Sequence, residues 1–497
     1  MIVRPALLAT AGLLSLAAGA DELEQRLRAS NKWVRKSAVE ALVKLGDEAS
    51  LVRLVGLLGD PAGEVADTAE WGLVRAGAAL DGAAERFPAA VVDALDGRDG
   101  LGAKDEWVRR RAWGVARAAP QALGAELGAR AWRRGLGDGD VEVRVSALGA
   151  VERLARQDAS ALAAIETAVR RGIAGARRAR EAPVAAAALF AEVAVDASAA
   201  RSSWDAAAED RRPEVLAAAA RTALAVGAAP ATLVRFLDGA AAAVIEASDA
   251  LSLAEAAPLL VACLDEERPL ALRTRAWRRL VLRSGWRHGL NSPAWEAWLE
   301  NPIACPTEPR ETAAHASTAV AAYDPPSDRV VFLVDLSGSV WREREDGTRP
   351  RDDLVASTAA IVSRLPETTR FDVGVFTGAM EFAAGELVAA TRARRRSAER
   401  FLEDASLQGP GDVWSAMLRA LQDPEVDTLV ILTDGEPTGG RRHRLELLAE
   451  VWGVRTRVRP VALEVLLIDA PPRVHRGWQA IVAEGGGRVL DAVLRDG

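Results

Sequence analysis

The sequence predicts a multidomain protein in which an all-helical repeat region precedes an α/β domain built on a doubly wound parallel sheet. Two observations support this prediction. The apolar runs at residues 330–334 and 428–432 are too short for helices and are typical of strands buried on both faces of a parallel sheet. Before residue 285, pairs of apolar and small residues four apart recur at intervals of roughly 30–45 residues, which indicates stacked helix pairs.

Composition sets the broad class of the protein. The chain has 497 residues, of which 49% are hydrophobic, enough for two or more packed domains. The formal net charge is −7 and no long block of lysine or arginine stands out, so we expect no nucleic-acid partner. Four histidines and two cysteines leave no Cys/His set for a structural zinc ion.

The first 20 residues have the three-part layout of a signal peptide. Arg4 precedes an apolar core over residues 6–17, and Ala18-Gly19-Ala20 precedes an acidic stretch. We therefore expect cleavage after Ala20 and export to the periplasm or the extracellular space. An uncleaved anchor and an intracellular helix are the alternatives. No later segment reaches about 18 uncharged apolar residues, so we expect no membrane span after cleavage. The abundance of Arg, Ala and Gly is typical of a GC-rich, bacterial genome.

Residues 21–285 carry the helical repeat, in which small alanines stand where a neighbouring helix would approach closely. The V-R-x-x-A pattern after an acidic turn resembles HEAT repeats, and this resemblance implies an α-solenoid. Over residues 161–244 an irregular helical bundle is the alternative. The repeated pairs are Val34/Ala38, Val65/Ala69, Val108/Ala112, Val143/Ala147, Val215/Ala219 and Leu272/Ala276. Most nearby tryptophans are interpreted as core residues rather than as a binding groove; they are Trp33, Trp71, Trp107, Trp113, Trp132 and Trp277.

Residues 286–326 form a proline-rich connector, with one short helix expected over residues 293–300. Cys263 lies in the last part of the helical repeat, and Cys305 lies within the connector. In an exported protein they could form a disulfide that ties the last repeat helices to the connector. Two buried thiols are an equally weighted alternative.

Residues 327–497 alternate strands with helices, which is typical of a doubly wound parallel sheet. After the first strand we expect a charged loop, a helix, a second strand and a basic helix. A further helix leads to the strand at residues 428–432, and one more strand precedes the last turn and strand. The expected ranges are 354–364, 371–376, 391–403, 413–421, 461–468 and 483–490.

Oxygen-bearing side chains follow two of the predicted strands. Asp335, Ser337 and Ser339 come at steps of two after the first strand, and Thr433 and Asp434 follow the strand at 428–432. Because ligands of open α/β sheets collect at the carboxyl ends of strands, we expect these residues to share one site. Carboxylates and hydroxyls form the hard-oxygen environment that Mg²⁺ accepts.

The D-x-S-x-S pattern at Asp335, Ser337 and Ser339, together with T-D-G at residues 433–435, resembles the metal-ion-dependent adhesion site of the von Willebrand factor A (VWA) domain. The resemblance implies that these three residues hold Mg²⁺, or Mn²⁺ or Ca²⁺, and that Asp434 acts through water. It also implies a partner protein whose carboxylate completes the coordination. The alternative is that the serines cap a helix and that Asp434-Gly435 is an ordinary turn.

The sequence departs from the family at Gly411, where the resemblance implies threonine. Asp412 follows, and we count it among the candidate metal ligands although helix capping is the favoured role. Five arginines on nearby loops should rim the site, either steering an acidic partner or remaining simply solvated. They are Arg342, Arg344, Arg441, Arg442 and Arg444.

These patterns predict a non-enzymatic, divalent-cation-dependent protein-binding or scaffold protein, in which the helical repeats give a second interaction surface. One alternative is a solenoid scaffold with a VWA domain that binds no metal. A less favoured alternative is a metal-dependent phosphate-ester hydrolase with Asp335 as nucleophile. Enzymes of that kind carry a second acid where Ser337 stands, and the chain has no G-x-S-x-G, Walker or H-E-x-x-H motif.

Overall fold

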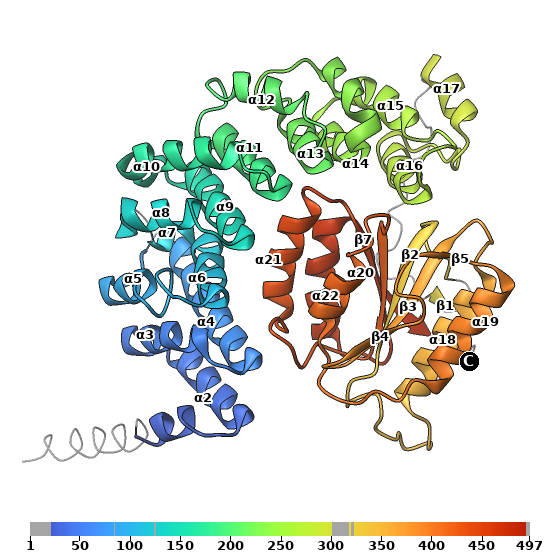
Figure 1. Cartoon of the computed structure of the whole chain (residues 1–497). Helices are drawn as coiled ribbons and strands as arrows, with labels where there is room; N and C mark the ends of the chain where they lie inside the picture. The colour runs from blue at the N-terminus through green and yellow to red at the C-terminus, as the bar shows by residue number, and fades with distance from the viewer. Residues whose placement is uncertain (1–20, 84, 124–125, 301–317, 320–322, 494–497) are drawn as a thin grey trace, which may run out of the picture. The chain divides into compact units, whose positions relative to one another are not determined.

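The computed structural model describes residues 21–83, 85–123, 126–300, 318–319 and 323–493 (Figure 1). The chain divides into two compact units, residues 1–168 and 169–497. The predicted signal peptide at residues 1–20 lies outside the described residues, as does Cys305. Cys263 is a buried free thiol, and burial raises its pKa to about 11. Within the described ranges, no helix is long and apolar enough to cross a membrane.

In the first unit, four helices pack in succession along one side of the repeat: α2 (Lys32–Leu45), α4 (Gly63–Ala83), α6 (Glu106–Ala118) and α9 (Val141–Gln157) (Figure 1). The alanines of the repeated pairs are buried throughout, as their close-approach role requires. This unit also contains α3 (Glu48–Gly56), η1 (Leu57–Gly59), α5 (Ala89–Asp96), α7 (Pro120–Leu123) and α8 (Ala129–Leu136), and α10 (Ala159–Arg177) crosses the boundary between the units.

The tryptophans of the repeat are not equally buried. Trp113 and Trp132 are buried and pack edge to face, with ring centroids 5.2 Å apart, as a core interpretation requires. Trp33 is 47% exposed, so the core interpretation is wrong for this residue. Its ring is covered by the ammonium groups of Lys32 and Lys36, which lie 5.0 and 5.8 Å from the ring centroid.

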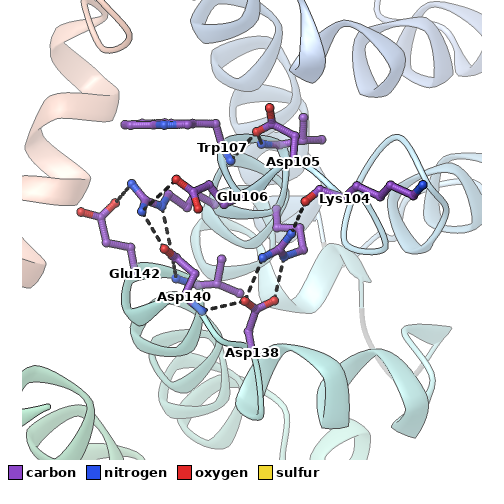
Figure 2. Close-up of polar contacts among 11 residues, drawn as sticks. Lys104, Asp105, Glu106, Trp107, Asp138, Asp140 and Glu142 are labelled. Atoms are coloured by element: carbon purple, nitrogen blue, oxygen red, sulfur yellow. Dashed lines mark hydrogen bonds and ion pairs between the residues drawn. The ribbon is translucent and has the colours of Figure 1, made fainter.

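An arginine–aspartate ladder links consecutive helix pairs. Arg35 donates to both carboxylate oxygens of Asp60 at 2.9 Å, and Arg109 donates to those of Asp138 at 2.7 and 3.0 Å (Figure 2). Arg109 also donates to the backbone carbonyls of Ala103 and Lys104, just as Arg35 does five and six residues before itself. Each arginine thus ties the turn before its own helix to the acidic turn of the next pair. This contact explains why both residue types recur in the sequence.

Further helices of the second unit precede the strands of the sheet in the sequence, apart from the five helices that pack on the sheet itself. They are α11 (Ala182–Val195), α12 (Arg201–Ala207), α13 (Pro213–Thr222), η3 (Pro230–Phe236), α14 (Leu237–Ala247), η4 (Ser248–Ala250), α15 (Leu253–Ala262), α16 (Leu270–Ser284) and α17 (Ser292–Glu300). The last of these is the short helix expected within the connector.

The sheet has the strand order β1-β8-β7-β6-β2-β3-β4. From β2 the chain moves outward to β3 and β4, then returns to place β6 on the other side of β2. Strand order therefore reverses between β2 and β6. The parallel strands are β2 (Arg329–Asp335), β3 (Arg370–Phe376), β6 (Thr428–Thr433), β7 (Ala462–Leu467) and β8 (Arg488–Val493), with β1 (Thr318–Ala319) parallel to β8. Two short strands, β4 (Met380–Phe382) and β5 (Val388–Ala389), run antiparallel to β3.

Helices cover both faces of this sheet. One face packs against α18 (Pro350–Arg364) and α19 (Arg392–Asp404). The other packs against α20 (Val413–Ala420), α21 (Leu445–Thr456) and α22 (Pro472–Gly485). The predicted fold class, helical repeats followed by a doubly wound, VWA-like α/β domain, is confirmed.

We predict that Arg109→Ala lowers the free energy of unfolding by about 2 kcal/mol, because the carboxylate of Asp138 and two backbone carbonyls lose their donor. Urea denaturation of the full chain followed by circular dichroism measures this loss. Arg98→Ala is the matched control: Arg98 is exposed, and its removal should change stability by less than about 0.5 kcal/mol. Equal losses in the two variants would contradict a structural role for the ladder.

Candidate metal centre

The predicted site residues meet at one edge of the sheet. Asp335 is the last residue of β2, and Thr433 is the last residue of β6. These strands are adjacent and parallel, with Val334 opposite Leu432, so both end at the same edge. Because strand order reverses between them, their carboxyl ends flank the crevice in which α/β sheets commonly bind ligands.

A continuous chain of hydrogen bonds joins the two strand ends. Thr433 Oγ1 donates to Asp335 Oδ2 at 2.7 Å, and the backbone N–H of Ser337 donates to Asp335 Oδ1 at the same distance. The hydroxyls of Ser337 and Ser339 lie 3.2 Å apart, and Ser339 Oγ donates to Asp434 Oδ1 at 2.9 Å. The structure thus brings together four of the five candidate ligands. Thr433, part of the T-D-G motif but not counted as a ligand, contacts Asp335 directly.

The electrostatics of this cluster leave negative charge uncompensated. Asp335 is 4% exposed and its pKa is raised to about 6. Burial is the largest cause and the negative charge of Asp434 adds to it, whereas the hydrogen bonds from Thr433 and Ser337 act in the opposite direction. Burial also raises the pKa of Asp434, while the hydrogen bond from Ser339 and the charges of Arg342 and Arg344 lower it. A cation placed among these oxygens would stabilise both carboxylates.

A third loop completes the surroundings of the site. The backbone N–H of Gly338 donates to the carbonyl of Gly409 at 2.9 Å, and that of Gly411 donates to Thr438 Oγ1 at 3.0 Å. A Cβ atom at Gly411 would lie 3.6 Å from both Asp335 Oδ1 and Ser337 Oγ. The φ angle of Gly411 is outside the left-handed region, so glycine is not required there by backbone conformation. Position 411 therefore faces the oxygen cluster without contributing a side-chain oxygen to it.

Asp412, the fifth candidate ligand, points into helix α20. Its Oδ1 accepts from the backbone N–H of Ser415 at 3.0 Å, and its Oδ2 accepts from Ser415 Oγ at 2.7 Å. These are N-cap contacts, which satisfy donors at the start of the helix.

Trp341 holds two of the site loops together. Its indole N–H lies 3.1 Å from the carbonyls of both Leu336 and Leu407. The guanidinium of Arg351 stacks 5.5 Å from the Trp341 ring centroid and donates to the carbonyl of Ala405 at 2.9 Å. Sequence reasoning did not identify this contact, because the paired residues lie more than 60 positions apart.

The five expected rim arginines have different environments. Arg342 and Arg441 are exposed and Arg444 is half-buried. Arg344 is held by Asp353 and by Asp469, the latter at 2.6 Å. Arg442 is buried, so the expectation that it belongs to a solvent-facing rim is wrong. Of these residues, Arg342 combines exposure with a direct electrostatic effect on Asp434.

The donor set fits a hard cation that accepts hydroxyl ligands. In the described part of the chain, no group of three or more His, Cys, Asp or Glu side chains could hold a metal ion. A metal at this edge would therefore be coordinated by serine hydroxyls as well as by carboxylate, a set that suits Mg²⁺, Mn²⁺ or Ca²⁺ better than zinc.

No established family profile matches the chain. About a quarter of it, 137 residues, is 28% identical to inter-alpha-trypsin inhibitor heavy chain H1 of Mesocricetus auratus, and 129 residues are 29% identical to heavy chain H2 of Homo sapiens. These matches span 14% and 13% of the two relatives, which contain VWA domains.

Among solved structures, a designed armadillo repeat protein is similar over 41% of this chain and 98% of its own, with 16% identity and a TM-score of 0.31. The phycocyanin lyase complex of CpcE and CpcF from Nostoc sp. PCC7120 is similar over 56% of this chain and 93% of its own, with 19% identity and a TM-score of 0.28.

We predict that Asp335→Asn stabilises the metal-free protein at pH 7. The folded pKa of about 6 lies above the ordinary value of 3.8, so the buried charge destabilises the fold at pH 7, and this cost disappears as pH falls through 6 toward 3.8. The gain should be about 3 kcal/mol at pH 7 and about 1 kcal/mol at pH 4.5.

Urea denaturation in EDTA at both pH values measures this difference. Asp404→Asn, which neutralises an exposed carboxylate, serves as the control and should change stability little at either pH. A loss of stability in Asp335→Asn at pH 7 would show that the carboxylate is already compensated in the metal-free protein.

Proposed function

We propose that the α/β domain binds a divalent cation at Asp335, Ser337, Ser339 and Asp434, and uses the cation to capture an acidic group of a partner protein. The observation that carries the proposal is the chain of hydrogen bonds that gathers Ser337 and Ser339 between buried Asp335 and Asp434. Two carboxylates at one desolvated edge raise each other's free energy unless a cation lies between them.

Each residue has a distinct role in this proposal. Asp335, Ser337 and Ser339 supply direct or nearly direct oxygen ligands, and Asp434 acts through water. Thr433 orients the Asp335 carboxylate through its hydroxyl. When bound, the cation supplies a positive charge with open coordination positions, which a carboxylate from outside can fill.

The distant relatives support a role in protein interaction, since they contain VWA domains. Exposed Arg342 would add positive potential beside the site and favour an acidic partner. The helical repeats would give a second interaction surface. On the strength of the N-terminal layout, we further propose that the protein acts outside the cytoplasm, in the periplasm or the extracellular space.

Isothermal titration calorimetry with Mg²⁺, Mn²⁺ and Ca²⁺ tests the proposed site. We expect saturable binding to the full chain, and loss of that binding in Asp335→Ala with the fold retained. Unchanged affinity in this variant would refute the assignment.

Asp412→Ala is the matched control for the same titration. If Asp412 only caps α20, the variant should lose about 1 kcal/mol of stability and keep its metal affinity. A large drop in metal affinity with an unchanged melting temperature would instead make Asp412 a ligand.

We also predict that Gly411→Ser raises cation affinity by about tenfold, because a hydroxyl at this position would point toward Asp335 and Ser337. The new Cβ would lie 3.2 Å from Ser337 Cβ, a tight contact that a small shift relieves. Gly411→Ala adds the same Cβ without oxygen and should bring no gain. Equal affinities for the two variants, measured by calorimetry, would show that the added oxygen does not reach the metal.

A further inference from the structure

Helix α19 presents a set of arginines to solvent. Arg392, Arg394, Arg396 and Arg400 are all exposed, and among the described residues none of them forms an ion pair. Within the described ranges, the hydrogen bond that one of these guanidinium groups makes runs from Arg400 Nε to the carbonyl of Arg396, at 3.3 Å. A fifth arginine, Arg395, is half-buried and donates to the carbonyl of Leu365.

Three of these side chains form one stripe. Arg392, Arg396 and Arg400 are four residues apart, so they lie on the same side of the helix and span about 12 Å. Ala398 and Leu402 are buried on the opposite side, in the core beneath α18 and α19. We call Arg392, Arg396 and Arg400 the arginine face.

The arginine face destabilises helix α19 when no partner is bound to it. Like charges four residues apart repel one another, and cations near a helix N-terminus oppose the helix dipole. The first turn of α19 holds no acidic residue to offset them. Residues 392–400 contain five arginines and one glutamate, in a chain whose net charge is −7. A helix whose charges conflict with its own stability in this way often forms an interaction site.

We propose that the arginine face binds an acidic segment of a partner protein that carries carboxylates at helical spacing. Guanidinium groups bind carboxylates in a bidentate geometry, and acidic residues at i, i+4 and i+8 of a second helix would match the stripe. This proposal is independent of the proposed metal centre, because no residue of the face belongs to the three site loops.

A narrow anionic segment fits this face better than an extended anionic surface. Glu399 lies between Arg396 and Arg400, Glu403 and Asp404 follow on the same helix, and the chain as a whole is acidic. A membrane or a nucleic-acid duplex is wide enough to place negative charges close to these carboxylates as well. At a separation below the Debye length of about 8 Å, the two sets of negative charges would repel each other. A second copy of the chain, pairing Glu403 with Arg392, is distinguished from such a segment by the sedimentation outcome of the test.

The test uses a labelled helical peptide with glutamate at every fourth position, titrated with the full chain in EDTA and followed by fluorescence anisotropy. We expect binding that weakens as NaCl is raised from about 50 to about 300 mM. The triple variant Arg392→Ser, Arg396→Ser and Arg400→Ser should bind at least about tenfold more weakly. Because EDTA is present, this binding needs no metal ion, which separates it from metal-dependent capture.

A second triple variant matches the charge change elsewhere on the surface: Arg98→Ser, Arg171→Ser and Arg178→Ser, at three exposed arginines of the helical repeats. It should bind the peptide as the parent protein does. Equal weakening in both triple variants, or no weakening in the first, would overturn the proposal. So would arginine-face-dependent binding to anionic vesicles or duplex DNA without binding to the peptide, or a dimer in sedimentation that the first triple variant abolishes.

Discussion

A carboxylate buried at the end of a strand must have its charge balanced, and the α/β domain is arranged around one such group, Asp335. Its two oxygens accept hydrogen bonds from Thr433 and Ser337, which fix its orientation. They do not remove its charge, and nearby Asp434 adds a second negative charge. A residue that destabilises an otherwise well-packed sheet, as this charged carboxylate does, commonly belongs to a ligand-binding site.

The rest of the domain positions this carboxylate. The reversal of strand order brings the ends of β2 and β6 together, and apolar residues bury both faces of these strands against five helices. The three loops above the strand ends are held by one another: Gly338 contacts Gly409, Gly411 contacts Thr438, and Trp341 bridges Leu336 and Leu407. A site supported in this way can keep its oxygens in place before any ligand arrives.

Much of this arrangement could be predicted from the sequence, because local patterns encode it. The apolar runs identified β2 and β6, and the spacing of Asp335, Ser337 and Ser339 identified the oxygens at one strand end. The ladder arginines Arg35 and Arg109 and the acidic turns were visible as parts of the repeat, although the pairing between them was not.

Other features depend on contacts between distant residues. Strands β1, β4 and β5 are two or three residues long, too short for a period-two pattern, and they form where a longer strand offers an open edge. The exposure of Trp33 and the burial of Arg442 depend on which neighbours pack beside them, which composition does not reveal. Asp412 makes the contacts with Ser415 that are expected of a helix N-cap. From the sequence alone, its position beside the site was compatible with two roles, N-cap and metal ligand.

We propose further interaction surfaces on the helical repeats and on the arginine face of α19, but the proposed function depends first on a metal ion bound at the end of β2. Anomalous X-ray diffraction from crystals grown with Mn²⁺ tests this claim most directly, because it locates the ion rather than inferring it from affinity. Our account predicts one anomalous peak within coordinating distance of the oxygens of Asp335, Ser337 and Ser339. A well-ordered site with no peak there, or a peak at other residues, would contradict it.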